Sequence, residues 1–174
     1  MAMKEAKLKL YYLFMLADGE ATAQEEEQLA AIRDAMGITA GDIKKVMRSY
    51  EHLTVIPRGD YSALVIGEAD KILTGEEKTW WDPINRNKRK QAQVIWTLID
   101  LGHADGDYSE PEQKVVAHLV DKWDFDKTTL AAMLDIAQEM LKLRAQPADA
   151  ATEAALQQLR EKAESLIPPK PPQS

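Results

Sequence analysis

Apolar side chains recur along this chain every three or four positions, in successive segments that each span several turns of a helix. That spacing places them on one face of an α-helix, whereas a half-buried strand would alternate apolar and polar positions. The clearest stripes are Leu29, Ile32 and Met36; Val115, Val116, Leu119, Val120 and Trp123; and Leu156, Leu159, Ala163 and Leu166. No segment has convincing strand alternation, so the pattern predicts an all-α chain.

The chain also contains an internal repeat, in which Tyr12–Met47 aligns with Ile99–Leu134 without a gap. Ala-Asp-Gly-Glu at 17–20 matches Ala-Asp-Gly-Asp at 104–107, an offset of 105 − 18 = 87 residues. An apolar helix precedes this turn in both copies. We therefore interpret the apolar run Leu10–Ala17 as a core helix, and it is too short to cross a bilayer.

Helix-start signals follow each turn. Thr22 with Glu25, and Ser109 with Glu112, form capping boxes, in which a hydroxyl and a carboxylate each bind a free backbone N–H group. A second start follows in each copy, predicted from Thr39 in the first and from Asp126 in the second. Each copy is therefore expected to contain three helices.

The remaining segments complete the predicted architecture. A helix is expected near Ser62–Leu73 between the copies, and another over Ala150–Leu166 after the break at Gln146-Pro147. We predict one compact bundle of about seven or eight helices over 1–166, with repeat units at about 4–52 and 86–144 packed about a pseudo-twofold axis. The proline-rich tail, 167–174, is predicted to be extended or disordered.

Charge and composition narrow the class of function. The formal net charge is −7, with 22 basic and 29 acidic residues, which argues against a nucleic-acid backbone as the main ligand. The absence of cysteine excludes disulfides, thiol catalysis and thiolate metal sites. We expect a cytoplasmic protein that is not an integral membrane protein.

The two acidic turns are the candidate chemical site. Asp18 and Asp105 fall at helix C-termini, where the helix dipole disfavours an anion by roughly 0.3–1 kcal/mol, and further acids lie close by. A hard cation such as Ca²⁺, Mg²⁺ or Mn²⁺ suits carboxylate ligands, although Asp-Gly is also an ordinary structural turn. The acids at the start of an EF-hand loop are missing. The candidate ligands are Asp18, Glu20, Glu25, Glu26, Asp105, Asp107 and Glu112.

Two Ala-Asp-Gly turns followed by capping acids, nearly ninety residues apart in a helical chain, resemble the TerB-like tellurite resistance family. The resemblance covers about Tyr11 to Leu143. It implies a symmetric helical bundle, acids that bind metal, a setting of tellurite resistance and stress response with membrane-linked partner proteins, and no defined enzymatic reaction. The matching acids are Asp18, Glu25, Glu26, Asp105 and Glu112, while Gln113 replaces the equivalent of Glu26.

A basic run at a predicted helix start, together with two neighbouring tryptophans, is the second candidate surface. It is expected either to bind a partner protein or to be a solvated face beside core tryptophans. Its residues are Trp80, Trp81, Arg86, Lys88, Arg89 and Lys90.

His103 precedes the second turn, and we interpret it as a structural histidine rather than a zinc ligand, because no histidine pair has metal-ligand spacing. No nucleophile, phosphate-binding loop or zinc-protease motif is present, so no enzymatic activity is expected. The leading hypothesis is a cation-binding stress-response protein. The alternative is a metal-free helical adaptor for other proteins.

Overall fold

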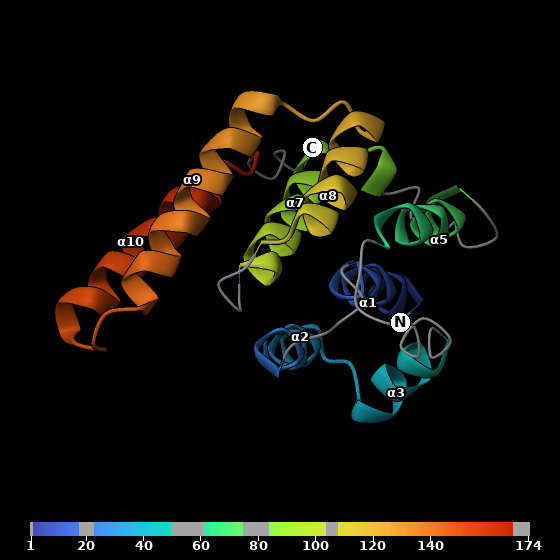
Figure 1. Ribbon diagram of the computed structural model, residues 1–174, viewed down its shortest axis with the longest axis horizontal. Coiled ribbons are helices and arrows are strands. Elements are labelled where there is room, and N and C mark those ends of the chain that lie inside the picture. The colour runs from blue at the N-terminus through green and yellow to red at the C-terminus, as the bar shows by residue number, and fades with distance from the viewer. Residues whose placement is uncertain (1, 18–22, 50–60, 75–83, 104–107, 169–174) are drawn as a thin grey trace, which may run out of the picture.

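The computed structural model describes residues 2–17, 23–49, 61–74, 84–103 and 108–168. All regular elements in these ranges are α-helices, which confirms the predicted fold class (Figure 1). The helices are α1 (Ala2–Met15), α2 (Ala23–Met36), α3 (Ala40–Ser49), α5 (Ser62–Thr74), α7 (Lys88–Gly102), α8 (Glu110–Lys122), α9 (Lys127–Arg144) and α10 (Ala150–Ser165).

The predicted helix starts are set by the expected local hydrogen bonds. Ser109 Oγ accepts from the Glu112 backbone N–H at 3.3 Å, and Glu112 Oε1 accepts from the Ser109 backbone N–H at 3.0 Å. At the starts of α9 and α3, Asp126 accepts from the Thr129 N–H, and Thr39 Oγ1 accepts from the Asp42 N–H. The other predicted capping box begins at Thr22, which lies outside the described residues.

The two copies also end their second helices in the same way. Gly37 and Asp124, 87 residues apart, both have positive φ angles, of 71° and 48°. In both copies the next residue's N–H group donates back into the helix, Ile38 to Arg33 O and Phe125 to Val120 O. Glycine adopts this left-handed conformation freely and aspartate tolerates it, so the repeat extends to backbone geometry.

The helix packing has the predicted internal symmetry. Helices α1, α2 and α3 of the first copy correspond to α7, α8 and α9 of the second. Within the copies, α1 contacts α2 and α3, just as α7 contacts α8 and α9. Between the copies, α1 contacts α8, just as α7 contacts α2. The α1–α7 contact maps onto itself. The two copies therefore pack on each other as related units, with α1 and α7 at the centre.

Helix α1 lies deepest in the main core. Every residue from Leu10 to Ala17 is at most 4% exposed, because α2, α3, α5, α7 and α8 all contact this helix. The apolar run that begins at Leu10 is therefore a core helix, as predicted from the repeat.

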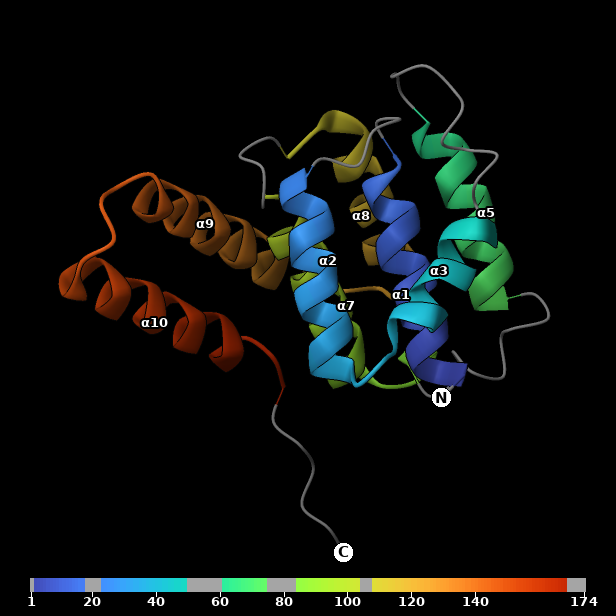
Figure 2. The same cartoon turned by 90° about the horizontal axis from the view of Figure 1, so that it is seen from below.

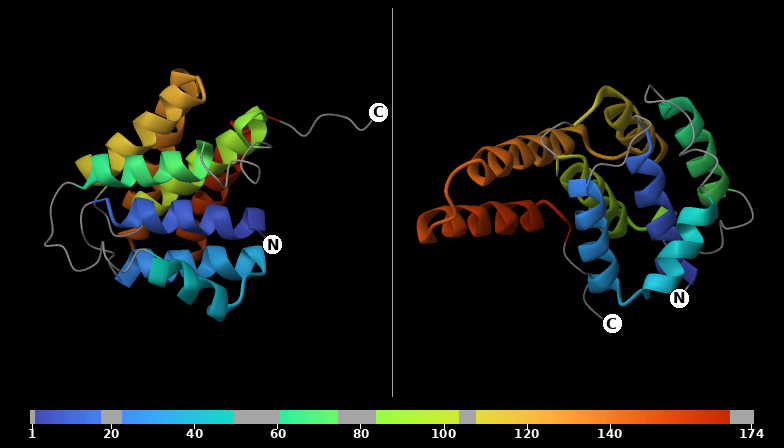
Figure 3. Two further views of the ribbon diagram at one scale, coloured as in Figure 1. Left: turned by 90° about the vertical axis from the view of Figure 1, so that its right-hand side faces the viewer. Right: turned by 60° about the horizontal axis from the view of Figure 1, so that its bottom comes forward.

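Two helices break the symmetry. Helix α5 packs on α1 and α8, whereas α10, which follows the second copy, packs on α9 instead (Figure 2). Helices α9 and α10 form an antiparallel hairpin that extends to one side of the bundle (Figure 3). A small separate core, formed by Ile136, Met140, Leu156 and Ala163, holds the hairpin together. Trp96 and Leu166 pack against both this small core and the main one.

Candidate functional site

The two acidic turns leave the bundle from neighbouring helix ends. Gly102, in the last turn of α7, is so close to α1 that a Cβ atom there would lie 3.1 Å from Phe14 Cζ and 2.7 Å from Tyr108 Cδ1. Phe14 is in the last turn of α1, and Tyr108 is the first described residue after the second turn. The chain therefore enters both acidic turns at the same end of the bundle.

The contacts along α1 and α7 show that the two helices run in the same direction. Near their starts, the charge of Lys90 acts on Lys7; further along, the side chains of Tyr11 and Thr97 share a hydrogen bond. Phe14 and Gly102 meet at the far end. Basic side chains thus gather where these helices start, and the acidic turns follow where they end.

The structure describes only part of the predicted metal site. Glu26 lies in the first turn of α2 with an exposed side chain, and Glu112 is buried at 1% exposure. Glu25 lies in the same turn of α2, but its side chain is outside the description. The candidates that lie outside the described residues are Asp18, Glu20, Asp105 and Asp107.

Glu112 has a structural role in the second copy. Its Oε1 atom accepts from both the Ser109 N–H, at 3.0 Å, and the Ser109 hydroxyl, at 2.7 Å. Burial, and secondarily the negative charge of Glu112, raises the pKa of the Tyr108 hydroxyl well above its usual value. A buried carboxylate and a neutral phenol therefore lie together at the start of α8.

Among the described residues, no group of three or more His, Asp or Glu side chains could hold a metal ion. Four of the seven predicted ligands lie outside those residues, so the predicted cation site stays a prediction. His103 is 3% exposed; its Nδ1 is 2.7 Å from Ile99 O, and its ring contacts the Tyr108 ring at 4.7 Å. This environment matches the structural histidine expected from the sequence.

The predicted basic run divides into residues with different roles. Lys88 Nζ donates to Trp123 O at 2.6 Å and to Asp124 O at 3.3 Å, so Lys88 binds the C-terminal end of α8. Arg86 is exposed. Lys90 lies close enough to α1 for its positive charge to act on Lys7: burial, and secondarily the charge of Lys90, lowers the pKa of the half-buried Lys7 side chain. Trp80 and Trp81, which were grouped with this run, lie outside the described residues.

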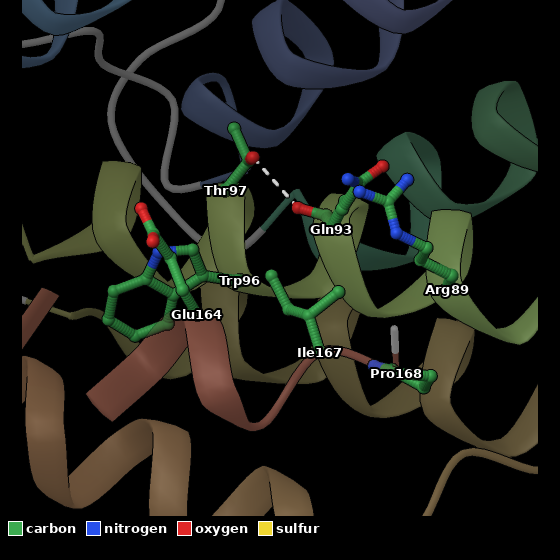
Figure 4. A pocket seen from close by; sticks show the side chains of 7 residues that line it. All are labelled: Arg89, Gln93, Trp96, Thr97, Glu164, Ile167 and Pro168. Carbon is green, nitrogen blue, oxygen red and sulfur yellow. Dashed lines mark hydrogen bonds between the residues drawn. The ribbon is translucent and has the colours of Figure 1, made fainter. Parts of the chain in front are cut away.

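Arg89 belongs to a pocket that the sequence analysis did not identify. A surface groove of about 490 Å³ lies between α7 and the segment that ends α10 (Figure 4). Its lining residues are Arg89, Gln93, Trp96, Thr97, Glu164, Ile167 and Pro168. Comparison of the two repeat copies contains one sequence feature that could have indicated this groove. Thr97 and Asp100 stand where the first copy has the buried Leu10 and Leu13, so this face of α7 is less covered than its counterpart.

No helix of the described residues is long and apolar enough to cross a membrane. The family model described as tellurite resistance protein TerB matches residues 4–135, more than two thirds of the chain. Searches of curated proteins and of solved structures find no match. The match ends within α9, so most of the α9–α10 hairpin lies beyond it.

Proposed function

Because the chain belongs to the TerB tellurite resistance family, we propose that it binds a divalent cation through its two acidic turns. The observation that carries the proposal is the contact between the last turns of α1 and α7, at Phe14, Gly102 and Tyr108. Both turns follow helices that end at this one end of the bundle, so the chain enters the two acidic segments, 87 residues apart in sequence, from neighbouring helix ends.

The physical argument is electrostatic. Acids that follow a helix C-terminus meet both the negative end of the helix dipole and each other's charge. A hard cation such as Ca²⁺, Mg²⁺ or Mn²⁺ removes that repulsion and accepts oxygen ligands without thiols. The proposed ligands come from Asp18, Glu20, Glu25, Glu26, Asp105 and Asp107, with Glu112 adding negative charge from the second cap.

The role that we propose is a non-enzymatic one in the cytoplasm, in tellurite resistance or a related stress response. TerB is not known as a family of enzymes. A cation between the turns would stabilise the ends of α1 and α7 against each other. Because these are the central helices, the bound ion could change the surface that the bundle presents to a partner protein.

The test is a thermal melt of metal-stripped protein titrated separately with Ca²⁺, Mg²⁺ and Mn²⁺. A ligand that binds only the native state raises stability by RT ln(1 + [L]/Kd), so saturating stabilisation is expected for at least one cation. Asp18→Asn and Asp105→Asn should each reduce it. Asp135→Asn is the control, because it removes one exposed carboxylate of α9 that belongs to neither turn in the sequence.

Three results would be informative. Loss of the response in both turn variants but not in Asp135→Asn supports a shared site, and loss in one variant only places the cation at that turn. An absence of any cation response, with turn variants more stable than the parent, would mean that the acids only repel each other. The cation proposal would then be abandoned.

A metal-free adaptor is the second candidate function. The observation that favours it is the α9–α10 hairpin, which extends beyond the family match and contacts the bundle through α9, Trp96 and Leu166. A partner-binding extension on a family-matched bundle would have this form. Deleting residues 147–168 should abolish capture of a partner while leaving any cation response unchanged.

A further inference from the structure

The pocket between α7 and the end of α10 has chemistry of its own, independent of the acidic turns. Arg89 and Glu164 both line it, and neither side chain makes an ion pair within the described part of the chain. Among the described residues, a guanidinium and a carboxylate that form no ion pair therefore face one groove. Within that part of the chain, both charges remain available to a ligand.

The two charges lie toward opposite ends of the groove (Figure 4). Arg89 is at one end, while Trp96 and Glu164 lie toward the other. Seven residues of helix separate Arg89 from Trp96, a rise of about 10 Å along α7. An extended peptide in the polyproline II conformation covers that distance in about three residues, because each rises by about 3.1 Å, and its repeat of about three residues per turn places side chains i and i+3 on the same side.

The floor between the charges suits a peptide backbone and its side chains. Trp96 gives a flat apolar wall at one end, Ile167 lies in the middle of the groove, and Pro168 lies toward the Arg89 end (Figure 4). Gln93 supplies an amide side chain, and the Thr97 hydroxyl donates to Gln93 O at 2.8 Å. The lining residues are all half-buried or exposed, so the site is a surface groove and not an enclosed small-molecule cavity.

The electrostatic surroundings give the groove a direction. Lys90 follows Arg89 in the chain, and its charge acts on the half-buried Lys7 of α1, so further positive charges lie near the Arg89 end. Glu164 makes the other end unfavourable for an anion. A purely acidic ligand would be repelled at one end, and a purely basic ligand at the other.

We propose that this groove binds an extended segment of a partner protein in which an acidic and a basic side chain stand about three residues apart. The acidic side chain pairs with Arg89, the basic side chain pairs with Glu164, and the intervening backbone lies against Trp96. The groove joins the family-matched bundle to the hairpin beyond it, so the bound peptide contacts both parts.

The test is a ¹H–¹⁵N NMR titration of the full chain, in EDTA, with the peptide acetyl-Asp-Ala-Ala-Lys-amide. Saturable shifts are expected at the Trp96 indole N–H and along Arg89–Thr97, with no comparable shifts from acetyl-Asn-Ala-Ala-Gln-amide. Arg89→Gln and Glu164→Gln should each weaken binding at least fivefold. The matched controls Arg160→Gln and Glu139→Gln, exposed on α10 and α9, should leave the Kd unchanged.

Three results would overturn the proposal. Equal binding of the charged and neutral peptides would show that the groove does not recognise the acidic and basic side chains of the peptide. An unchanged Kd in Glu164→Gln would remove the second charge from recognition. Equally tight binding of ε-aminocaproate, which has two opposite charges but no peptide backbone, would assign the groove to a small zwitterion instead. The presence of EDTA keeps these outcomes separate from failure of the cation proposal.

Discussion

Gly102 offers the sharpest test of how the two repeat copies meet. An added Cβ atom would lie 2.7 Å from Tyr108 Cδ1, 3.0 Å from Tyr108 Cε1 and 3.1 Å from Phe14 Cζ. Phe14 is fully buried, and the Tyr108 ring packs on the His103 ring, so neither neighbour can move aside easily. Gly67, in α5, is the matched control, because a Cβ atom there meets nothing within 4 Å.

The expected free-energy changes have opposite signs. Gly67→Ala should stabilise the fold by about 0.5–1 kcal/mol, the usual gain from replacing glycine inside a helix. Gly102→Ala gains less than this at a helix end and adds an overpacking cost of about 1–3 kcal/mol. We expect net destabilisation of about 1 kcal/mol, so the two variants should differ by about 2 kcal/mol.

Urea denaturation at pH 7, followed by far-UV circular dichroism, measures both free-energy changes, provided that the slope of the unfolding free energy against urea concentration is the same in parent and variants. In a Tyr108→Ala background the cost of Gly102→Ala should shrink, because the closest contact atoms are gone. A Gly102→Ala variant that is as stable as Gly67→Ala would refute the close contact between α1, α7 and the residues after the second turn.

Four further changes test other parts of the structure. Hydrogen bonds from the Thr152 backbone and side chain lower the pKa of Asp149, so α10 should lose stability as the pH falls below about 4. Asp149→Asn should remove this acid dependence, as measured by hydrogen exchange of the α10 amides. Burial raises the pKa of Tyr11 to about 12, so the fold should lose stability as the pH rises from about 10 towards that value; Tyr11→Phe should lack this alkaline loss in urea titrations. Trp96→Ala should lower the free energy of unfolding by about 2 kcal/mol, less than the loss expected for a fully buried tryptophan, because Trp96 is only partly buried. The same variant should speed amide hydrogen exchange in α10 more than in α1. Asp124→Gly should raise the melting temperature, with a gain of about 0.5–1 kcal/mol, because aspartate is strained at φ 48°.

The local features of this protein could be predicted from sequence because they depend on neighbours in the chain. The starts of α8 and α9 follow from Ser109 and Asp126, whose side chains bind N–H groups three residues ahead. The repeat likewise showed that Leu10–Ala17 is a core helix, since the second copy places the same pattern in its interior. The fold class follows from these local rules.

The candidate site could be predicted only in part, because side-chain type does not decide which partner a side chain finds. Lys88 belongs to a basic run that was expected either to bind a partner protein or to be a solvated face, and its ammonium group binds the carbonyl groups at the end of α8. Glu112 was both a candidate ligand and half of a predicted capping box, and it makes the capping hydrogen bonds with Ser109. The charge pattern does not reveal that the partners of Lys88 are backbone carbonyl groups.

Sequence by itself determined the helices, their caps and the duplication, since each depends on contacts within a few residues or on direct comparison of two segments. Tertiary structure alone decided that α5 packs on α1 and α8, that α10 packs on α9, and that a groove therefore opens beside Trp96. The physical reason is that an apolar stripe shows that a helix face is buried but not which helix covers it. That choice depends on packing between segments far apart in the chain.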